Sequence, residues 1–114
     1  MTDFSNLHAD ILQPHAEFDK WLIATFSISF DGLVGVLSEP HYTESDPLRT
    51  AGGSEDHWAF EFPSRMRISI IFRRPYEEAS ILADPPEVKV VLKTLQPLLL
   101  NRKVRILDPP ILLK

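Results

Sequence analysis

Large apolar side chains at every second position, on either side of a turn within residues 57–73, constrain the fold more than any other feature of this sequence. Aromatic side chains occupy every second position from Trp58 to Phe62, and large apolar side chains occupy every second position from Met66 to Phe72. A period of two is typical of a strand that buries one face. The segment therefore predicts two antiparallel strands joined by a tight turn.

The length of that turn decides which faces of the two strands meet. A two-residue turn would place Phe62 opposite an arginine and would mix the apolar and polar faces. A three-residue turn over 63–65 instead places Phe62 opposite Met66, and it pairs Glu61 with Arg67 on the outer face. We predict the three-residue turn.

The N-terminal third predicts a helix followed by a second hairpin. Ser5 can cap a helix, and apolar residues at helical spacing continue the pattern to about Ala24. The β-rich runs 26–30 and 33–37 then flank Asp31-Gly32, a pair that tolerates the positive φ angles of a type I′ turn. Residues 38–56 carry prolines, glycines and acidic residues without apolar periodicity, which predicts one long loop.

The C-terminal third predicts a helix and a last strand. Asp84 with Pro85 is typical of a helix start, and Pro97 should kink or end that helix. The expected buried stripe consists of Val88, Val91, Leu92, Leu95 and Leu99. Residues 103–107 predict a strand followed by a proline-broken apolar tail, whereas 76–83 fit either a short helix or an irregular connection.

Length and composition bound the class of protein. The 114 residues fit one small globular domain over 1–114, and we predict the α+β class: antiparallel β-hairpins of about five strands, with an N-terminal helix and a C-terminal-half helix packed on one sheet face. Cysteine is absent, which excludes a disulfide framework and a cysteine zinc site. We see neither a signal sequence nor an apolar run of membrane length, and we predict a cytoplasmic protein without a membrane partner.

The main functional prediction is a non-enzymatic binding or accessory protein of the regulatory, adaptor or inhibitor type. Alternation points several arginines away from the core, beside apolar residues that would otherwise be exposed. Such a face is suited to docking another protein chain or a second copy of this one. The predicted binding residues are Val34, Val36, Arg65, Arg67, Ile71 and Arg73.

Two alternatives remain open. A small enzyme or metal-binding protein could use the long loop 38–57, where a site would consist of His41, His57, Glu55 and Asp56, with Glu44 near it. Nucleic-acid binding through the arginine-rich strand is the other alternative. The net charge of −4 and the core-facing aromatic residues argue against it. No catalytic residue, metal ligand or cofactor is assigned.

Overall fold

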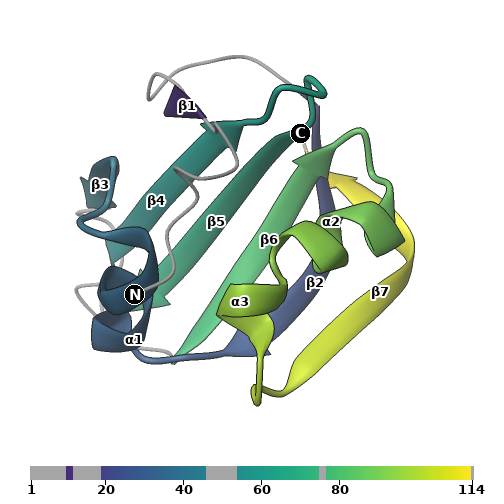
Figure 1. Cartoon of the computed structure of the whole chain (residues 1–114). Coiled ribbons are helices and arrows are strands. Elements are labelled where there is room, and N and C mark those ends of the chain that lie inside the picture. The colour runs from purple at the N-terminus through teal and green to yellow at the C-terminus, as the bar shows by residue number, and fades with distance from the viewer. Residues whose placement is uncertain (1–9, 12–18, 46–53, 75–76, 114) are drawn as a thin grey trace.

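The computed structural model describes residues 10–11, 19–45, 54–74 and 77–113, and within them the chain forms a small α+β domain (Figure 1). The elements are β1 (Asp10–Ile11), β2 (Lys20–Ser27), α1 (Phe30–Leu37), β3 (Tyr42–Ser45), β4 (Ser54–Glu61), β5 (Arg67–Arg74), β6 (Glu78–Asp84), α2 (Val88–Thr94), α3 (Gln96–Leu99) and β7 (Val104–Leu113). The sheet has the order β1-β4-β5-β6-β2-β7, and β3 also pairs with β4. The α+β class is confirmed, with seven described strands rather than about five.

The β4–β5 hairpin has the predicted register. Phe62 N–H donates to the Met66 carbonyl at 2.9 Å, which closes a three-residue turn in which Arg65 adopts a φ of 68°. The pairs Trp58–Ile70, Phe60–Ile68 and Glu61–Arg67 follow from this register. A one-residue slip would have exchanged the two faces, so the alternation and the turn length together determine the pairing.

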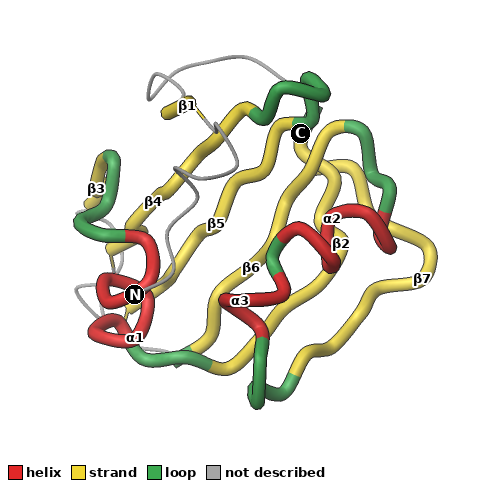
Figure 2. The backbone as a smooth tube through the Cα atoms, in the orientation of Figure 1, coloured by secondary structure: helices red, strands yellow, loops and turns green. Residues whose placement is uncertain are grey.

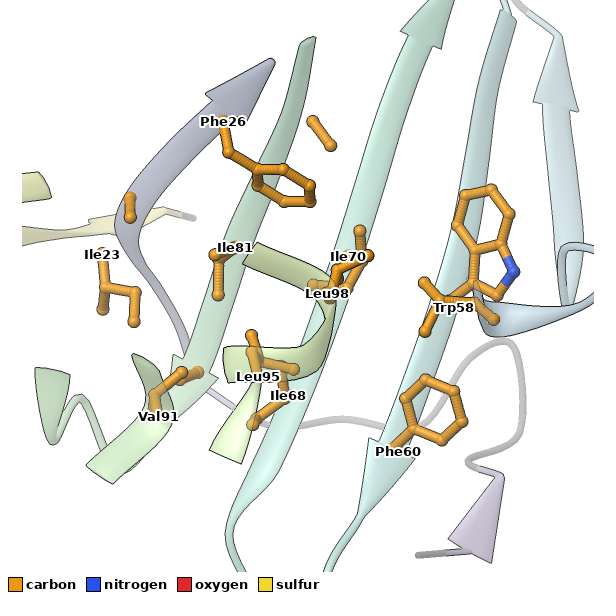
Figure 3. Packing of buried hydrophobic residues seen from close by; sticks show 14 of the residues in the cluster. Ile23, Phe26, Trp58, Phe60, Ile68, Ile70, Ile81, Val91, Leu95 and Leu98 are labelled. Carbon is orange, nitrogen blue, oxygen red and sulfur yellow. The ribbon is translucent and has the colours of Figure 1, made fainter. Parts of the chain in front are cut away.

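Side chains from the four central strands and from the three described helices form the apolar core. Figure 3 shows the part of it between the strands and the helical segment 91–98. Trp58 from β4, Ile70 from β5 and Ile81 from β6 are fully buried, as are Leu95 and Leu98 from the helical segment. The ring of Phe30 from α1 lies 6.4 Å from that of Trp58. Figure 1 shows α2 and α3 lying over β6 and β2. None of the helices in the described ranges is long and apolar enough to cross a membrane.

The predicted N-terminal helix is wrong where the structure describes it, because residues 20–27 form β2. This strand lies between β6 and β7, and its residues 23–26 are all buried. A strand that is buried on both faces has apolar residues at consecutive positions, without the period of two. Such a run is compatible with either a buried strand or a helix. Residues 1–9 and 12–18, where the predicted helix begins, lie outside the described residues.

The predicted hairpin around Asp31-Gly32 is also wrong, because Phe30–Leu37 forms α1. The Ser29 side-chain oxygen accepts a hydrogen bond from the Gly32 N–H at 3.0 Å and caps the helix. Leu33 and Leu37, four residues apart, are buried on one side of this helix. Val34 and Val36 therefore lie on a helix and not on a strand.

The C-terminal predictions are confirmed in part (Figure 2). The helix begins at Val88 rather than directly after Asp84, and its cap residue Glu87 makes no side-chain capping hydrogen bond. Of the predicted stripe, Val91 and Leu95 are buried and Val88, Leu92 and Leu99 pack against the core, while the buried Leu98 was missed. The helix is interrupted before Pro97, since α2 ends at Thr94 and α3 begins at Gln96. The ambiguous segment 76–83 contributes to the strand β6, and the last strand extends to Leu113.

Two alanine substitutions distinguish α1 from a hairpin. Ser29→Ala removes the capping oxygen and should lower the free energy of unfolding by about 1 kcal/mol. Gly35→Ala should raise it by about 0.5–1 kcal/mol, because alanine favours a helix and the added Cβ has open space around it. Urea denaturation measures both changes. Ser27→Ala, at an exposed position of β2, is the control and should change stability by less than about 0.5 kcal/mol.

Candidate functional site

A polar cluster lies where β3 pairs with β4. The register pairs Tyr42 with His57, Thr43 with Asp56 and Glu44 with Glu55. Because side chains alternate between the two faces of a sheet, Glu55 and His57 point away from the face that carries Trp58. Glu44 of β3 is directly opposite Glu55, so its side chain lies on the same face. The cluster therefore consists of Glu55 and His57 from β4 and Glu44 from β3.

His57 is the centre of this cluster. Its side chain is nine-tenths buried, and its Nε2 lies 3.6 Å from Glu55 Oε1 and 4.0 Å from Glu44 Oε2. Nε2 has no hydrogen-bond partner among the described residues. A buried polar atom without a partner typically costs about 1–3 kcal/mol, so this nitrogen requires an explanation. Burial lowers the pKa of His57, and the nearby Glu55 and Glu44 carboxylates oppose that shift.

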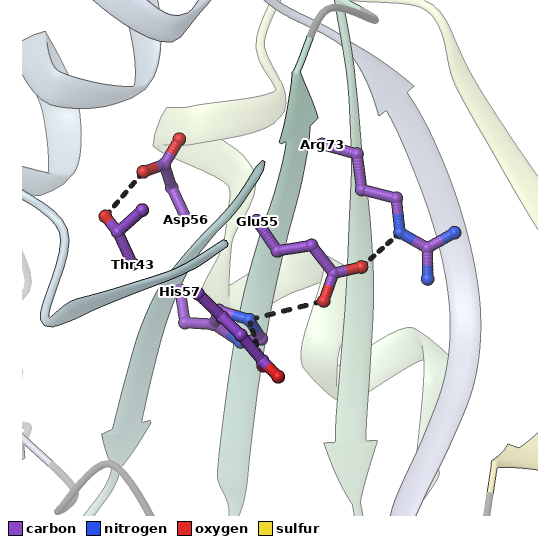
Figure 4. Close-up of polar contacts among 6 residues, drawn as sticks. Thr43, Glu55, Asp56, His57 and Arg73 are labelled. Atoms are coloured by element: carbon purple, nitrogen blue, oxygen red, sulfur yellow. Dashed lines mark hydrogen bonds and ion pairs between the residues drawn. The ribbon is translucent and has the colours of Figure 1, made fainter. Parts of the chain in front are cut away.

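Two neighbours hold the cluster in place: Tyr42, which stacks on His57, and Arg73, whose contact with Glu55 is drawn in Figure 4. The Tyr42 ring stacks on the His57 ring with centroids 4.3 Å apart and an angle of 10° between the planes. Arg73 Nε donates to Glu55 Oε2 at 2.6 Å, while the other oxygen of that carboxylate is the one nearer to His57. Burial raises the pKa of the Tyr42 hydroxyl, and the Glu44 and Glu55 carboxylates add to that shift.

The predicted loop site is only half assembled. His57 and Glu55 come together as expected, and Glu44 joins them, but Asp56 points to the opposite face and accepts a hydrogen bond from Thr43 Oγ1 at 2.7 Å. His41 is also separate: its Nδ1 accepts a hydrogen bond from the Ala59 N–H at 2.9 Å. Placing His41 and Asp56 in one site with His57 was therefore wrong. The predicted long loop is wrong as well, because it contains β3 and the start of β4; residues 46–53 lie outside the described residues.

The predicted binding face is not formed as one surface. Val34 and Val36 belong to α1, and Arg65 lies in the turn between β4 and β5. Arg67 and Arg73 are each paired with a β4 glutamate, which leaves less positive charge for an incoming phosphate or carboxylate. Ile71 is half-buried.

The centre of that face is not open either. Ser69 and Leu82, which the register places side by side on it, are only 4% and 1% exposed. From the sequence, this face was expected either to be open for docking or to be covered by the C-terminal tail or the first helical segment.

Among the described residues, four of the six exposed large apolar side chains lie instead along β7, at the outer edge of the sheet (Figure 1). No residue of this strand is buried, and Ile106, Ile111, Leu112 and Leu113 are 51%, 50%, 37% and 42% exposed. The apolar tail 111–113 was visible in the sequence, but its place in an edge strand was not. Pairing with β2 is interrupted between Ile106 and Ile111, a stretch that contains Pro109 and Pro110.

Comparisons of the chain with models of known protein families, with curated protein sequences and with solved structures found no match. The function is therefore inferred from the described side chains alone. Two features are candidates: the polar cluster on β3 and β4, and the apolar edge strand β7.

The environment of His41 predicts a pH-dependent stability. Burial lowers the pKa of His41 below its ordinary value of 6.5, and protonation of Nδ1 would break the hydrogen bond from Ala59. Below pH 6.5 the unfolded chain therefore binds more protons at His41 than the folded chain does. The contribution of neutral His41 to the free energy of unfolding is complete above pH 6.5 and is lost as the pH falls towards the pKa of His41 in the folded state. Urea denaturation between about pH 7.5 and about pH 5.5 should show this loss.

His41→Gln is the matched variant for this measurement, because glutamine can accept the Ala59 hydrogen bond and does not titrate. Its free energy of unfolding should fall less than that of the wild type over the same pH range. Equal decreases in both proteins would contradict the assigned role of His41.

Proposed function

We propose that this chain is a non-enzymatic protein-binding module whose contact surface is the open edge of β7. The supporting observation is the apolar character of this edge: ten residues, none of them buried, with four large apolar side chains exposed. Edge strands present unpaired backbone donors and acceptors, and proteins usually shorten them, cover them or give them charged residues. An apolar edge strand is suited to receiving a strand from another chain.

The prolines limit where such a strand would pair. Pro109 and Pro110 carry no backbone N–H, and Asp108 places a charge beside them. The uncharged triplet Ile111–Leu113 follows these prolines and pairs regularly with β2 on its other side. We therefore assign the contact to this triplet.

The partner we propose is a second copy of the chain. Antiparallel pairing of the triplet with itself, centred on Leu112, would bring Ile111 of one copy opposite Leu113 of the other. These residues carry no charge, so no like-charge repulsion opposes the contact. Each copy would contribute the same surface, as two-fold symmetry requires.

Light scattering after size-exclusion chromatography tests this proposal. Over a series of concentrations, the average mass of the wild type should rise towards that of a dimer. The double variant Ile111→Glu, Leu113→Glu should remain a monomer, because four carboxylates would meet at the interface. Circular dichroism confirms that the variant is folded.

Val90→Glu, Leu100→Glu is the matched control. Val90 on α2 and Leu100 after α3 are similarly exposed, at 48% and 64%, but they are not in the edge strand. This control should associate like the wild type. A wild type that stays monomeric at every concentration, or a control that loses association as the edge variant does, would contradict β7 as the self-association surface.

A further inference from the structure

We infer that Glu44, Glu55 and His57 form a binding site for a divalent transition-metal cation, distinct from the proposed contact at β7. The two sites belong to opposite ends of the strand order, since β3 pairs with β4 whereas β7 pairs with β2. Neither proposal depends on the other. The failure of one would leave the other unaffected.

The donor atoms are close to the spacing that a cation needs. One nitrogen and two carboxylate oxygens, one from each residue, all lie within 4.8 Å of one another, and among the described residues this is the one such group of three. Zinc binds imidazole nitrogen and carboxylate oxygen at about 2.0–2.2 Å, so ligands around one ion are about 3–3.5 Å apart. Small movements would bring the donors to that spacing. Glu44, whose side chain is 67% exposed, has the freedom to move.

The unsatisfied His57 nitrogen is the observation that distinguishes this cluster from an ordinary group of surface acids. Its Nε2 is buried, points at both carboxylates and has no hydrogen-bond partner among the described residues. In the neutral imidazole, Nε2 can donate its lone pair to a metal ion, which would give this buried nitrogen a partner.

The strand register adds an independent electrostatic argument. Glu44 and Glu55 are directly opposite each other on adjacent antiparallel strands, a placement that is unfavourable for like charges. Arg73 compensates part of that charge, but it contacts the Glu55 oxygen on the side away from His57. A cation between the two carboxylates and His57 would reduce the repulsion between Glu44 and Glu55.

The surroundings also orient the proposed ligands. Arg73 fixes the Glu55 carboxylate so that Oε1 is directed towards His57, and the stacked Tyr42 ring fixes the plane of the imidazole. Contacts of this kind hold metal ligands in place in known metal sites. The charged groups that act on His57 are Glu55 and Glu44, which favour its protonation, and Lys20, which opposes it.

The ligand set selects the class of cation. Mg²⁺ and Ca²⁺ prefer all-oxygen sites, whereas an imidazole nitrogen with two carboxylates suits zinc and its transition-metal neighbours. Three protein ligands would leave a fourth position for water.

Nuclear magnetic resonance of the histidine ring nitrogens at neutral pH tests the site, with Zn²⁺ as the probe. One equivalent of Zn²⁺ should shift the His57 Nε2 resonance and leave the His41 nitrogens unchanged, and the same amount of Mg²⁺ should shift neither. His8 and His15 lie outside the described residues, so each histidine must be resolved separately. An unshifted His57 Nε2 in the presence of Zn²⁺ would overturn the proposal.

Calorimetry on carboxylate variants provides the second test. Glu44→Gln and Glu55→Gln should each weaken Zn²⁺ binding at His57 by at least about tenfold. Glu61→Gln is the matched control. Like Glu55, Glu61 forms an ion pair with a β5 arginine, at 2.8 Å, but it does not belong to the cluster around His57. Equal affinities in all three variants would show that the carboxylates are not ligands.

Discussion

The register of the β4–β5 hairpin determines which β4 side chains enter the core and which form the candidate cation site. Pairing Phe62 with Met66 sends Trp58 and Phe60 to the core face of β4. The same alternation sends Glu55 and His57 to the other face. A shift of one residue would bury the charged set and expose the aromatic set, so the apolar core also fixes the orientation of the candidate cation site.

Both strands of this hairpin and their register could be predicted from the sequence, because only a three-residue turn places the apolar side chains of the two strands on one face. Of the three residues of the polar cluster, two were predicted as site residues and the third, Glu44, was only placed near them. His57 and Glu55 were identified, but His41 and Asp56 were grouped with them by proximity in the chain, and strand alternation separates them. Glu44 belongs to β3, a short strand of Tyr-Thr-Glu-Ser without an apolar pattern, which depends on pairing with β4.

Elsewhere local patterns were compatible with two structures, and tertiary contacts decided between them. The segment 30–37 contains a turn-forming pair, but the Ser29 cap and the burial of Leu33 and Leu37 favour a helix. The segment 20–27 has no clear period because β2 is enclosed by neighbouring strands. Whether β7 is an edge strand depends on the order of strands in the sheet, and no local pattern predicts that order.

Nuclear Overhauser contacts between Hα protons of β4 and β5 measure the register of this hairpin. In an antiparallel pair, residues that are opposite but not hydrogen-bonded bring their Cα atoms to about 4.5 Å. The Phe62–Met66 hydrogen bond makes Ala59–Ser69 and His57–Ile71 such pairs. The observed register predicts strong Hα–Hα contacts within both pairs. Contacts displaced by one residue along β5 would contradict the register, and with it the placement of Glu55 and His57 on the face opposite the core.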